Sequence, residues 1–280
     1  MSWPIPVGVN PTSIGVTSAW WLEAAVCFEE AGYRGAWCVD HFISRGLLAD
    51  PALECWTTIT AAAALTSRIR VGSFVLNVMN RHPAVLARMA ATLQEQSGGR
   101  LDLGIGTGGH PVEHAAMGIP FPDMPERVAR LEEAVQVLRL LWTGGPVSFD
   151  GRFYPLSDVH AFPIPVPPPR IIIGGTTPAG ARLAGRIGDG WTAYDRTFER
   201  DLPLCLEALA GTGRFRESFT AIVAVVLARD LPPDRQPFLA DPAGELERWR
   251  EAGADELIVS CVRTHNLDAI IEAAGRAGLA

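Results

Sequence analysis

The sequence contains no lysine, so all 24 of its basic residues are arginine. This absence excludes every mechanism that needs a side-chain amine: Schiff-base aldolases, pyridoxal-phosphate enzymes and the lysine of a P-loop. A bound phosphate would have to be held by arginine, by backbone N–H groups or by hydroxyl groups.

Other features are missing as well. No apolar run approaches the roughly 20 residues of a membrane span, and the first residues lack the basic and apolar regions of a secretory signal. The five cysteines form no C-x-x-C pair, and the net charge of −7 argues against non-specific nucleic-acid binding. The G-x-S-x-G motif of serine hydrolases is absent too. We expect a cytoplasmic protein with no membrane or nucleic-acid partner.

Short apolar runs recur along the chain, and each is followed by a helical pattern. They are continuous and rich in Val and Ile, as is typical of parallel strands buried on both faces. Eight such β-α units in series predict an α/β protein with a closed (β/α)₈ TIM barrel, in one domain over residues 1–280. The runs are Ile5–Val9, Gly35–Val39, Ile69–Leu76, Leu101–Ile105, Arg170–Ile173, Gly190–Ala193, Phe219–Ala228 and Glu256–Val259.

Helix starts are indicated where an N-cap residue precedes a proline. Three dipeptides fit this pattern: Asp50-Pro51, Thr177-Pro178 and Asp241-Pro242. One connection is long, because residues 143–169 read TGGPVSFDGRFYPLSDVHAFPIPVPPP. We interpret this segment as an insertion between the fourth helix and the fifth strand, with a turn at Asp150-Gly151.

The stretch GIGTGG at residues 104–109 fits the pattern G-x-G-x-x-G. That pattern indicates a Rossmann fold only where a helix opens directly from it. We expect prolines to break the following stretch, namely Pro111, Pro120, Pro122 and Pro125. The barrel interpretation instead places GIGTGG at the end of the fourth strand.

Polar and glycine-rich residues collect at the carboxyl ends of the predicted strands, where the active sites of such barrels lie. Glycine lets a ligand approach backbone N–H groups closely, so two segments are predicted to bind an anion such as a phosphate. They are Gly106-Thr107-Gly108 after the fourth strand and Gly174-Gly175-Thr176 after the fifth. Asp40, His41 and Asn77 follow the second and third strands.

Two histidines, His110 and His114, stand four residues apart, a spacing that can bind a metal on a helix. Pro111 disturbs that helix and the sequence offers no third ligand, so we assign no metal site. Metal-assisted hydrolysis through this pair stays open as an alternative function.

Three segments resemble the luciferase-like monooxygenase family. They are RHPAVLARMAATLQEQSGGR, the following LDLGIGTGGHPVEHAAMGIPFPDMPERVARLEEAVQVLRLLW, and PPRIIIGGTTPAGARLAGRIGDGW. The resemblance covers roughly residues 5–195, and the last third matches only in its β-α pattern. It implies a (β/α)₈ barrel that binds a flavin or a deazaflavin at its carboxyl mouth, and therefore an oxidoreductase.

Within this family two cofactors are possible. Some members use reduced flavin mononucleotide (FMN), supplied by a separate flavin reductase, together with O₂. Others use the deazaflavin coenzyme F-420 (F420 below), a hydride carrier. The pair Asp40-His41 in WCVDHF resembles the deazaflavin branch, so F420 is the favoured cofactor and FMN the alternative. A barrel that binds a ligand without turnover is a third possibility.

The resemblance also assigns roles to residues. Asp40 would bind the cofactor, and His41 would act near the carbon that accepts the hydride. One subgroup carries an acidic residue directly after GTG, where this chain has Gly109, so His110 and Glu113 are the nearest candidates for acid–base work. The substrate is expected to be a small molecule, and its identity depends on variable loops.

Two further expectations come from the resemblance. A bulge at the end of the third strand would carry a non-prolyl cis peptide between Phe74 and Val75 and press the backbone against the cofactor, with Asn77 just beyond it. A homodimer would form on the outer helices of the first half, where CWTTITAAAALTS and PAVLARMAATL are rich in small apolar residues.

Overall fold

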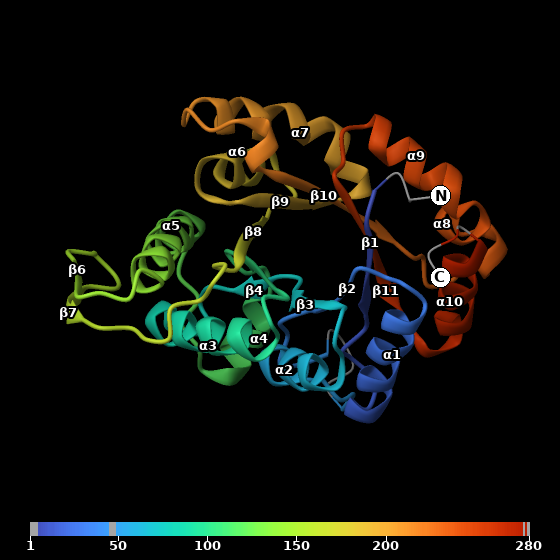
Figure 1. Ribbon diagram of the computed structural model, residues 1–280, viewed down its shortest axis with the longest axis horizontal. Helices are drawn as coiled ribbons and strands as arrows, with labels where there is room; N and C mark the ends of the chain where they lie inside the picture. The colour runs from blue at the N-terminus through green and yellow to red at the C-terminus, as the bar shows by residue number, and fades with distance from the viewer. Residues whose placement is uncertain (1–4, 45–48, 277, 279–280) are drawn as a thin grey trace.

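The computed structural model describes residues 5–44, 49–276 and 278, and it contains a closed barrel of parallel strands (Figure 1). The barrel closes because β3 pairs with both β2 and β5. The TIM-barrel prediction is confirmed. Around the barrel the strands are β1 (Val7–Pro11), β2 (Gly35–Cys38), β3 (Arg70–Ser73) with β4 (Leu76–Asn77), β5 (Leu101–Gly106), β8 (Arg170–Gly174), β9 (Gly190–Tyr194), β10 (Thr220–Val226) and β11 (Glu256–Val262).

The third barrel strand is interrupted. The predicted run Ile69–Leu76 forms two short strands, β3 and β4, with Phe74 and Val75 between them. The peptide bond from Phe74 to Val75 is cis, which confirms the expectation drawn from the family resemblance.

Helices cover the outside of the barrel (Figure 1). Thr177 and Asp241 cap helices as predicted, but the predicted start at Asp50-Pro51 is wrong, because the carboxylate of Glu54 caps α2 instead. The helices are α1 (Ser18–Glu30), α2 (Cys55–Leu65), α3 (Pro83–Gln96), α4 (Pro111–Met117), α5 (Met124–Leu141), α6 (Pro178–Ile187), α7 (Asp195–Ala210), α8 (Pro237–Ala240), α9 (Pro242–Glu251) and α10 (Leu267–Arg276). None of those described is both long and apolar enough to cross a membrane.

Two of the four prolines after GIGTGG start helices rather than break them, which corrects the expectation in part; Pro120 and Pro122 do lie in a non-helical segment between α4 and α5. Pro111 occupies the first turn of α4, and Pro125 occupies the first turn of α5. A first-turn proline is tolerated because its missing N–H would have no partner inside the helix.

The predicted insertion folds as an antiparallel hairpin of β6 (Val147–Phe149) and β7 (Leu156–Val159), which projects on the left of Figure 1. It is tied to α5, since the Glu133 carboxylate accepts hydrogen bonds from the backbone N–H groups of Phe153 and Tyr154. The ring of Tyr154 is buried there, against His82. That residues 1–280 form one domain stays a prediction, because both ends of this range lie outside the described residues.

Trp37 fills the interior of the barrel together with aliphatic side chains of other strands, namely Ile172, Ile222, Ala224 and Ile258. The indole lies so close to neighbouring strands that a Cβ on Gly8 or Gly35 would come within 1.8 or 2.2 Å of it. Glycine is therefore required at these two positions to make room for one large ring.

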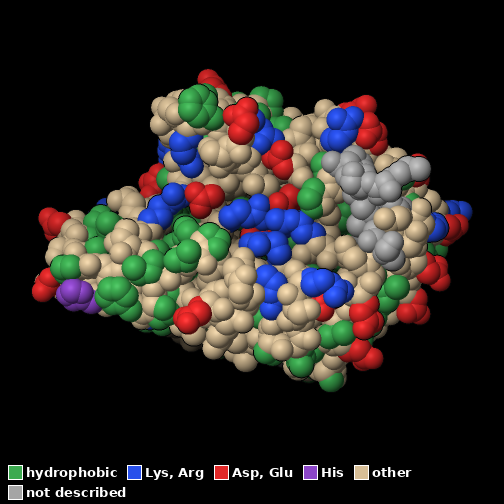
Figure 2. All heavy atoms as spheres, in the orientation of Figure 1, with side chains coloured by type: hydrophobic (Ala, Val, Ile, Leu, Met, Phe, Trp, Pro, Cys, Tyr) green, Lys and Arg blue, Asp and Glu red, His purple; other side chains and the backbone are tan. Residues whose placement is uncertain are grey.

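Charged side chains close the end of the barrel where the strands begin. Five residues form this arginine network: Arg34, Arg70, Arg170, Asp102 and Glu256. Asp102 is almost fully buried, with Arg70 Nη2 at 2.7 Å and Arg170 Nη2 at 2.9 Å from its carboxylate. Glu256 pairs with Arg34 at 3.0 Å and with Arg170 at 2.9 Å. Basic side chains also gather at the centre of the face that Figure 2 draws.

Candidate active site

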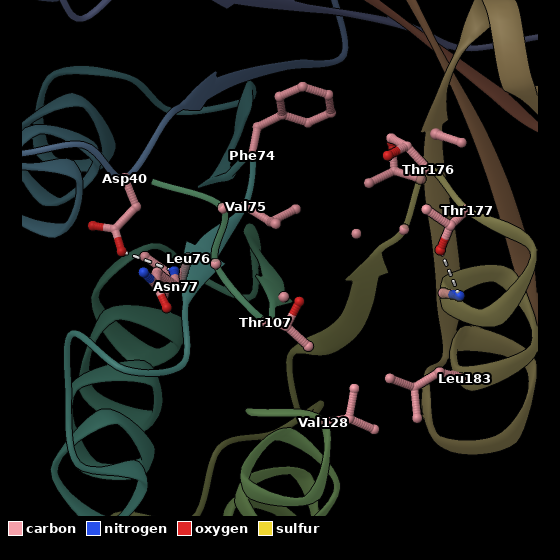
Figure 3. A pocket seen from close by; sticks show the side chains of 18 of the residues that line it. Asp40, Phe74, Val75, Leu76, Asn77, Thr107, Val128, Thr176, Thr177 and Leu183 are labelled. Atoms are coloured by element: carbon pink, nitrogen blue, oxygen red, sulfur yellow. Dashed lines mark hydrogen bonds between the residues drawn. The ribbon is translucent and has the colours of Figure 1, made fainter. Parts of the chain in front are cut away.

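A pocket of about 800 Å³ opens at the other end of the barrel, where the strands finish. The structure places every predicted site residue in its wall, including both glycine-rich segments. Figure 3 labels part of this wall, with Asp40 on one side and Thr176 on the other. These residues are Asp40, His41, Phe74, Val75, Asn77, Gly106, Thr107, Gly108, His110, Glu113, Gly174, Gly175 and Thr176.

The two glycine-rich segments lie on neighbouring strands, β5 and β8, which pair directly. Glycine is needed there for packing as well as for ligand approach. A Cβ on Gly174 would come within 2.6 Å of Val75, and a Cβ on Gly175 would come within 2.8 Å of the backbone of Gly180. The second segment leads into α6, whose N-terminus favours negative charge. We call these two segments the anion cradle.

Phe74 and Val75 form an apolar wall of the pocket. Both side chains project from the interruption between β3 and β4, as Figure 3 shows. The Phe74 ring meets the Tyr194 ring edge-on, with 6.3 Å between centroids. Tyr194 also lines the pocket; it follows the predicted strand Gly190–Ala193 and is not among the predicted site residues.

Three side chains form an acid–base cluster beside this wall: His41, His110 and Glu113. Glu113 Oε2 lies 3.4 Å from His41 Nδ1 and 3.5 Å from His110 Nδ1. The two imidazole rings are nearly perpendicular, with 5.5 Å between centroids. The three candidates for acid–base work thus come from two separate parts of the chain and share one carboxylate.

Glu113 is almost fully buried, and its backbone contacts explain how it keeps a charge there. Burial alone raises the pKa of this carboxyl, but the N–H groups of Phe42 and Ile43 donate to Oε2 at 2.8 and 3.2 Å. With both histidines nearby, these donors hold the pKa of Glu113 below its ordinary value. Glu113 is therefore an anion at neutral pH.

The carboxylate of Asp40 is already engaged in hydrogen bonds within the protein. Its carboxylate accepts two hydrogen bonds from Arg81, one from the Asn77 backbone N–H and one from the Asn80 amide, each at 2.9 Å. Asp40 lines the pocket, but these contacts make it a residue that fixes the end of β4. Direct binding of a cofactor by Asp40 stays a prediction.

Asn77 has its side chain engaged in the same way. Its Oδ1 accepts a hydrogen bond from the Met79 N–H at 3.0 Å, and its Nδ2 lies 2.6 Å from His114 Nε2. Because the amide oxygen already accepts a hydrogen bond, Nδ2 is the donor toward His114 Nε2.

The pair His110–His114, to which we assigned no metal site, does not lie within one helix. His110 is the N-cap of α4 and lies outside the helix, so the two residues do not share a helical face. His114 is fully buried, and its ring packs against Phe121 and contacts Asn77. The ligand-type atoms that do meet are those of the acid–base cluster, which lie within 4.8 Å of one another.

Comparisons with known proteins agree with this architecture. The sequence profile of the family described as luciferase-like monooxygenase matches residues 6–230. The F420-dependent glucose-6-phosphate dehydrogenase of Kineococcus radiotolerans is 32% identical over 88% of this chain and 72% of its own length. The protein of the same name from Beutenbergia cavernae is 35% identical over 83% of this chain and 68% of its own.

Two solved structures share the fold. An F420-dependent secondary alcohol dehydrogenase, in complex with an F420-acetone adduct, superposes with a TM-score of 0.85, at 20% identity over 98% of this chain and 99% of the other. The F420-dependent tetrahydromethanopterin reductase of Methanopyrus kandleri has a TM-score of 0.77, at 19% identity over 98% of each chain. Together with the matched profile, the relatives show that this chain belongs to the luciferase-like monooxygenase family.

Proposed function

We propose that this protein transfers a hydride between F420 and a small alcohol or carbonyl compound at the mouth of the barrel. The observation that carries the proposal is one continuous pocket that joins the anion cradle to the acid–base cluster. The relatives support it, since their names combine F420 with a dehydrogenase of a sugar phosphate or of a secondary alcohol. A hydroxyl or carbonyl carbon is therefore the reacting group we propose.

The residues of the pocket fit a cofactor that joins a flat ring system to a phosphate. Val75 can stand against the rings because Gly106 and Gly174 carry no side chain, and a Cβ on either would come within 3.1 or 2.6 Å of it. The anion cradle offers the phosphate backbone N–H groups at the start of α6, one of the kinds of donor open to a chain without lysine.

F420, when bound, supplies a ring carbon that can accept or release a hydride. Oxidation of an alcohol carbon also frees the hydroxyl proton, and His41 lies in the pocket wall to take it. Since Nδ1 of His41 faces Glu113, Nε2 is the atom that exchanges a proton with the substrate oxygen. The anionic Glu113 stabilises the positive charge that His41 gains.

A binding experiment tests this function. The protein is incubated separately with F420 and with FMN and then desalted, and the retained chromophore is measured by absorbance. We expect F420 to stay bound and its absorbance to change on turnover with a panel of secondary alcohols and sugar phosphates. Retention of FMN alone would support the monooxygenase alternative, and retention without turnover would support a ligand-binding barrel.

The assembly of the protein also stays a proposal. We propose a homodimer, but the small residues of α2 and α3 that suggested it, such as Ala62, Ala87 and Ala90, are buried inside the fold. Leu65 and Val85 on these helices are more than half exposed, at 58% and 56%, and are better interface candidates. A cytoplasmic location stays a prediction, as does a flavin reductase partner in the FMN alternative.

A further inference from the structure

The side chains of the acid–base cluster surround one point of the pocket. His41 follows β2, whereas His110 and Glu113 lie at the start of α4. One ligand-type atom of each residue lies within 4.8 Å of the other two. Glu113 Oε2 is 3.4 Å from His41 Nδ1 and 3.5 Å from His110 Nδ1. Both separations exceed the length of an ordinary N–H···O hydrogen bond, which is about 2.7–3.2 Å.

These separations match those of ligands around a zinc ion. Tetrahedral zinc has Zn–N and Zn–O bonds of about 2.0–2.2 Å, so neighbouring ligand atoms lie about 3.3–3.5 Å apart. The two histidine–carboxylate distances, 3.4 and 3.5 Å, fall within this range. Two imidazoles with one carboxylate also form a ligand set of zinc sites that keep a fourth position open. Imidazole nitrogen favours zinc and similar transition metals, whereas Mg²⁺ and Ca²⁺ prefer oxygen ligands.

The burial of the cluster favours a cation as well. The Glu113 side chain is 1% exposed, and its Oε1 has no hydrogen-bond partner among the residues that the structure describes. A buried carboxylate oxygen without a partner costs free energy, which a bound cation would recover. The side chains of His41 and His110 are 25% and 15% exposed and line the pocket. A cation can therefore enter from the pocket, and a water molecule can take the fourth position.

We propose that the acid–base cluster binds a zinc ion and that the bound ion inhibits turnover. The ligands are Nδ1 of both histidines and the carboxylate of Glu113. When zinc takes Nδ1 of His41, the proton that this nitrogen holds toward Glu113 moves to Nε2 through solvent, and the imidazole stays neutral. Nε2 then has no lone pair with which to accept the proton of a substrate hydroxyl. The zinc site stands on geometry alone, whereas the inhibition rests on the proposed function.

A zinc titration of the protein without F420 tests the site. We expect one zinc ion per chain by isothermal titration calorimetry, and the visible absorption of a four-coordinate site when Co²⁺ replaces zinc. His110→Ala and Glu113→Gln should each weaken zinc binding about 100-fold or more, because loss of even a residue that only orients a ligand costs about 10- to 100-fold. Mg²⁺ should not compete with zinc. His265→Ala is the matched control, since it removes an exposed imidazole that does not line the pocket.

Turnover with F420 tests the inhibition. Zinc should stop oxidation of the alcohol reversibly, and EDTA should restore the activity. The affinity for F420 should stay unchanged, because the anion cradle is untouched. In His110→Ala, about 100-fold more zinc should be needed to halve the activity that this variant has without zinc.

The outcomes separate the zinc site from the proposed function. Unchanged zinc affinity in both cluster variants would place the ion elsewhere and overturn the site, as would an unaltered protein that turns over with F420 but binds no zinc. Zinc that binds at the cluster and leaves turnover unchanged, or raises it, would overturn the inhibition. If the unaltered protein binds zinc at the cluster but does not bind F420, the proposed function and the inhibition fail while the zinc site stands.

Discussion

The two ends of the barrel are built differently. Where the strands begin, each carboxylate of the arginine network is paired with at least two arginines, at 2.7 to 3.4 Å. Where the strands finish, glycine and apolar side chains share the pocket wall with polar ones, and Glu113 Oε1 is buried with no hydrogen-bond partner among the described residues. One end satisfies its own charges, and the other retains polar groups for a ligand.

This difference assigns stability to one end and chemistry to the other, as is typical of (β/α)₈ barrels. Substitutions at each end of the barrel test this assignment. A substitution in the acid–base cluster should change turnover and leave unfolding nearly unchanged, whereas a substitution in the arginine network should do the reverse.

The largest effect is expected for His41→Ala. Loss of the group that exchanges a proton with the substrate should lower kcat about 10²- to 10⁴-fold, while F420 stays bound, because the anion cradle is untouched. Steady-state kinetics and a cofactor titration on the same preparation measure both quantities.

His160→Ala is the control for this prediction, because His160 is exposed on the inserted hairpin segment. Unchanged turnover in His41→Ala would assign the proton step to His110, whose Nδ1 faces the same carboxylate. Parallel loss of F420 binding would instead show that His41 acts in binding.

The second prediction addresses the opposite end. Asp102→Asn keeps the shape of the side chain but removes a buried charge that faces three arginines. We expect a loss of about 3–5 kcal/mol in the free energy of unfolding, measured by urea denaturation. The kcat of the folded variant should stay close to that of the unaltered protein.

The pKa of Asp102 also predicts how the stability of the fold depends on pH. Burial alone raises the pKa of Asp102, but hydrogen bonds and charge from Arg70 and Arg170 lower it well below its ordinary range. Its contribution to stability is therefore complete above the unfolded pKa of about 3.9 and is lost as the pH falls through the lower folded value.

Asp255→Asn is the control for the Asp102 substitution, because the half-exposed ion pair of Asp255 with Arg216 should contribute less than about 1 kcal/mol. Equal losses in the two variants would contradict a special role for the network.

Much of this comparison follows from local sequence patterns. The eight apolar runs gave the barrel, and the polar residues after them gave the pocket wall, because strand ends meet at one face whatever the loops do. The interruption at Phe74–Val75 came from resemblance alone. Helix starts were harder, since the proline pattern held at Thr177 and Asp241 but not at Asp50, where Glu54 takes the role of cap.

Contacts between distant segments could not be predicted. The carboxylate of Glu113 meets His41 and the backbone of Phe42 across about 70 residues, which no spacing rule reveals. The arginine network likewise joins residues at or next to the starts of five strands. The spacing of His110 and His114 suggested a shared helical face, but the helix begins only at Pro111.

The smallest expected effect concerns His114. We interpret it as a positioning residue that contributes both to stability and to cofactor binding. His114→Leu removes the acceptor that faces Asn77 Nδ2 at 2.6 Å and leaves a buried amide donor without a partner, at a cost of about 1–3 kcal/mol in stability. Asn77 also packs against the anion cradle, since a Cβ on Gly108 would come within 2.4 Å of its Oδ1. We therefore expect F420 affinity to fall several-fold as well, without a change in the pH profile of kcat. His114→Gln, whose side-chain oxygen can accept from Asn77, should restore most of both losses. If His114→Leu matches the unaltered protein in urea denaturation and in F420 titration, His114 merely fills space, and the division between a stabilising and a functional end of the barrel stands without an exception.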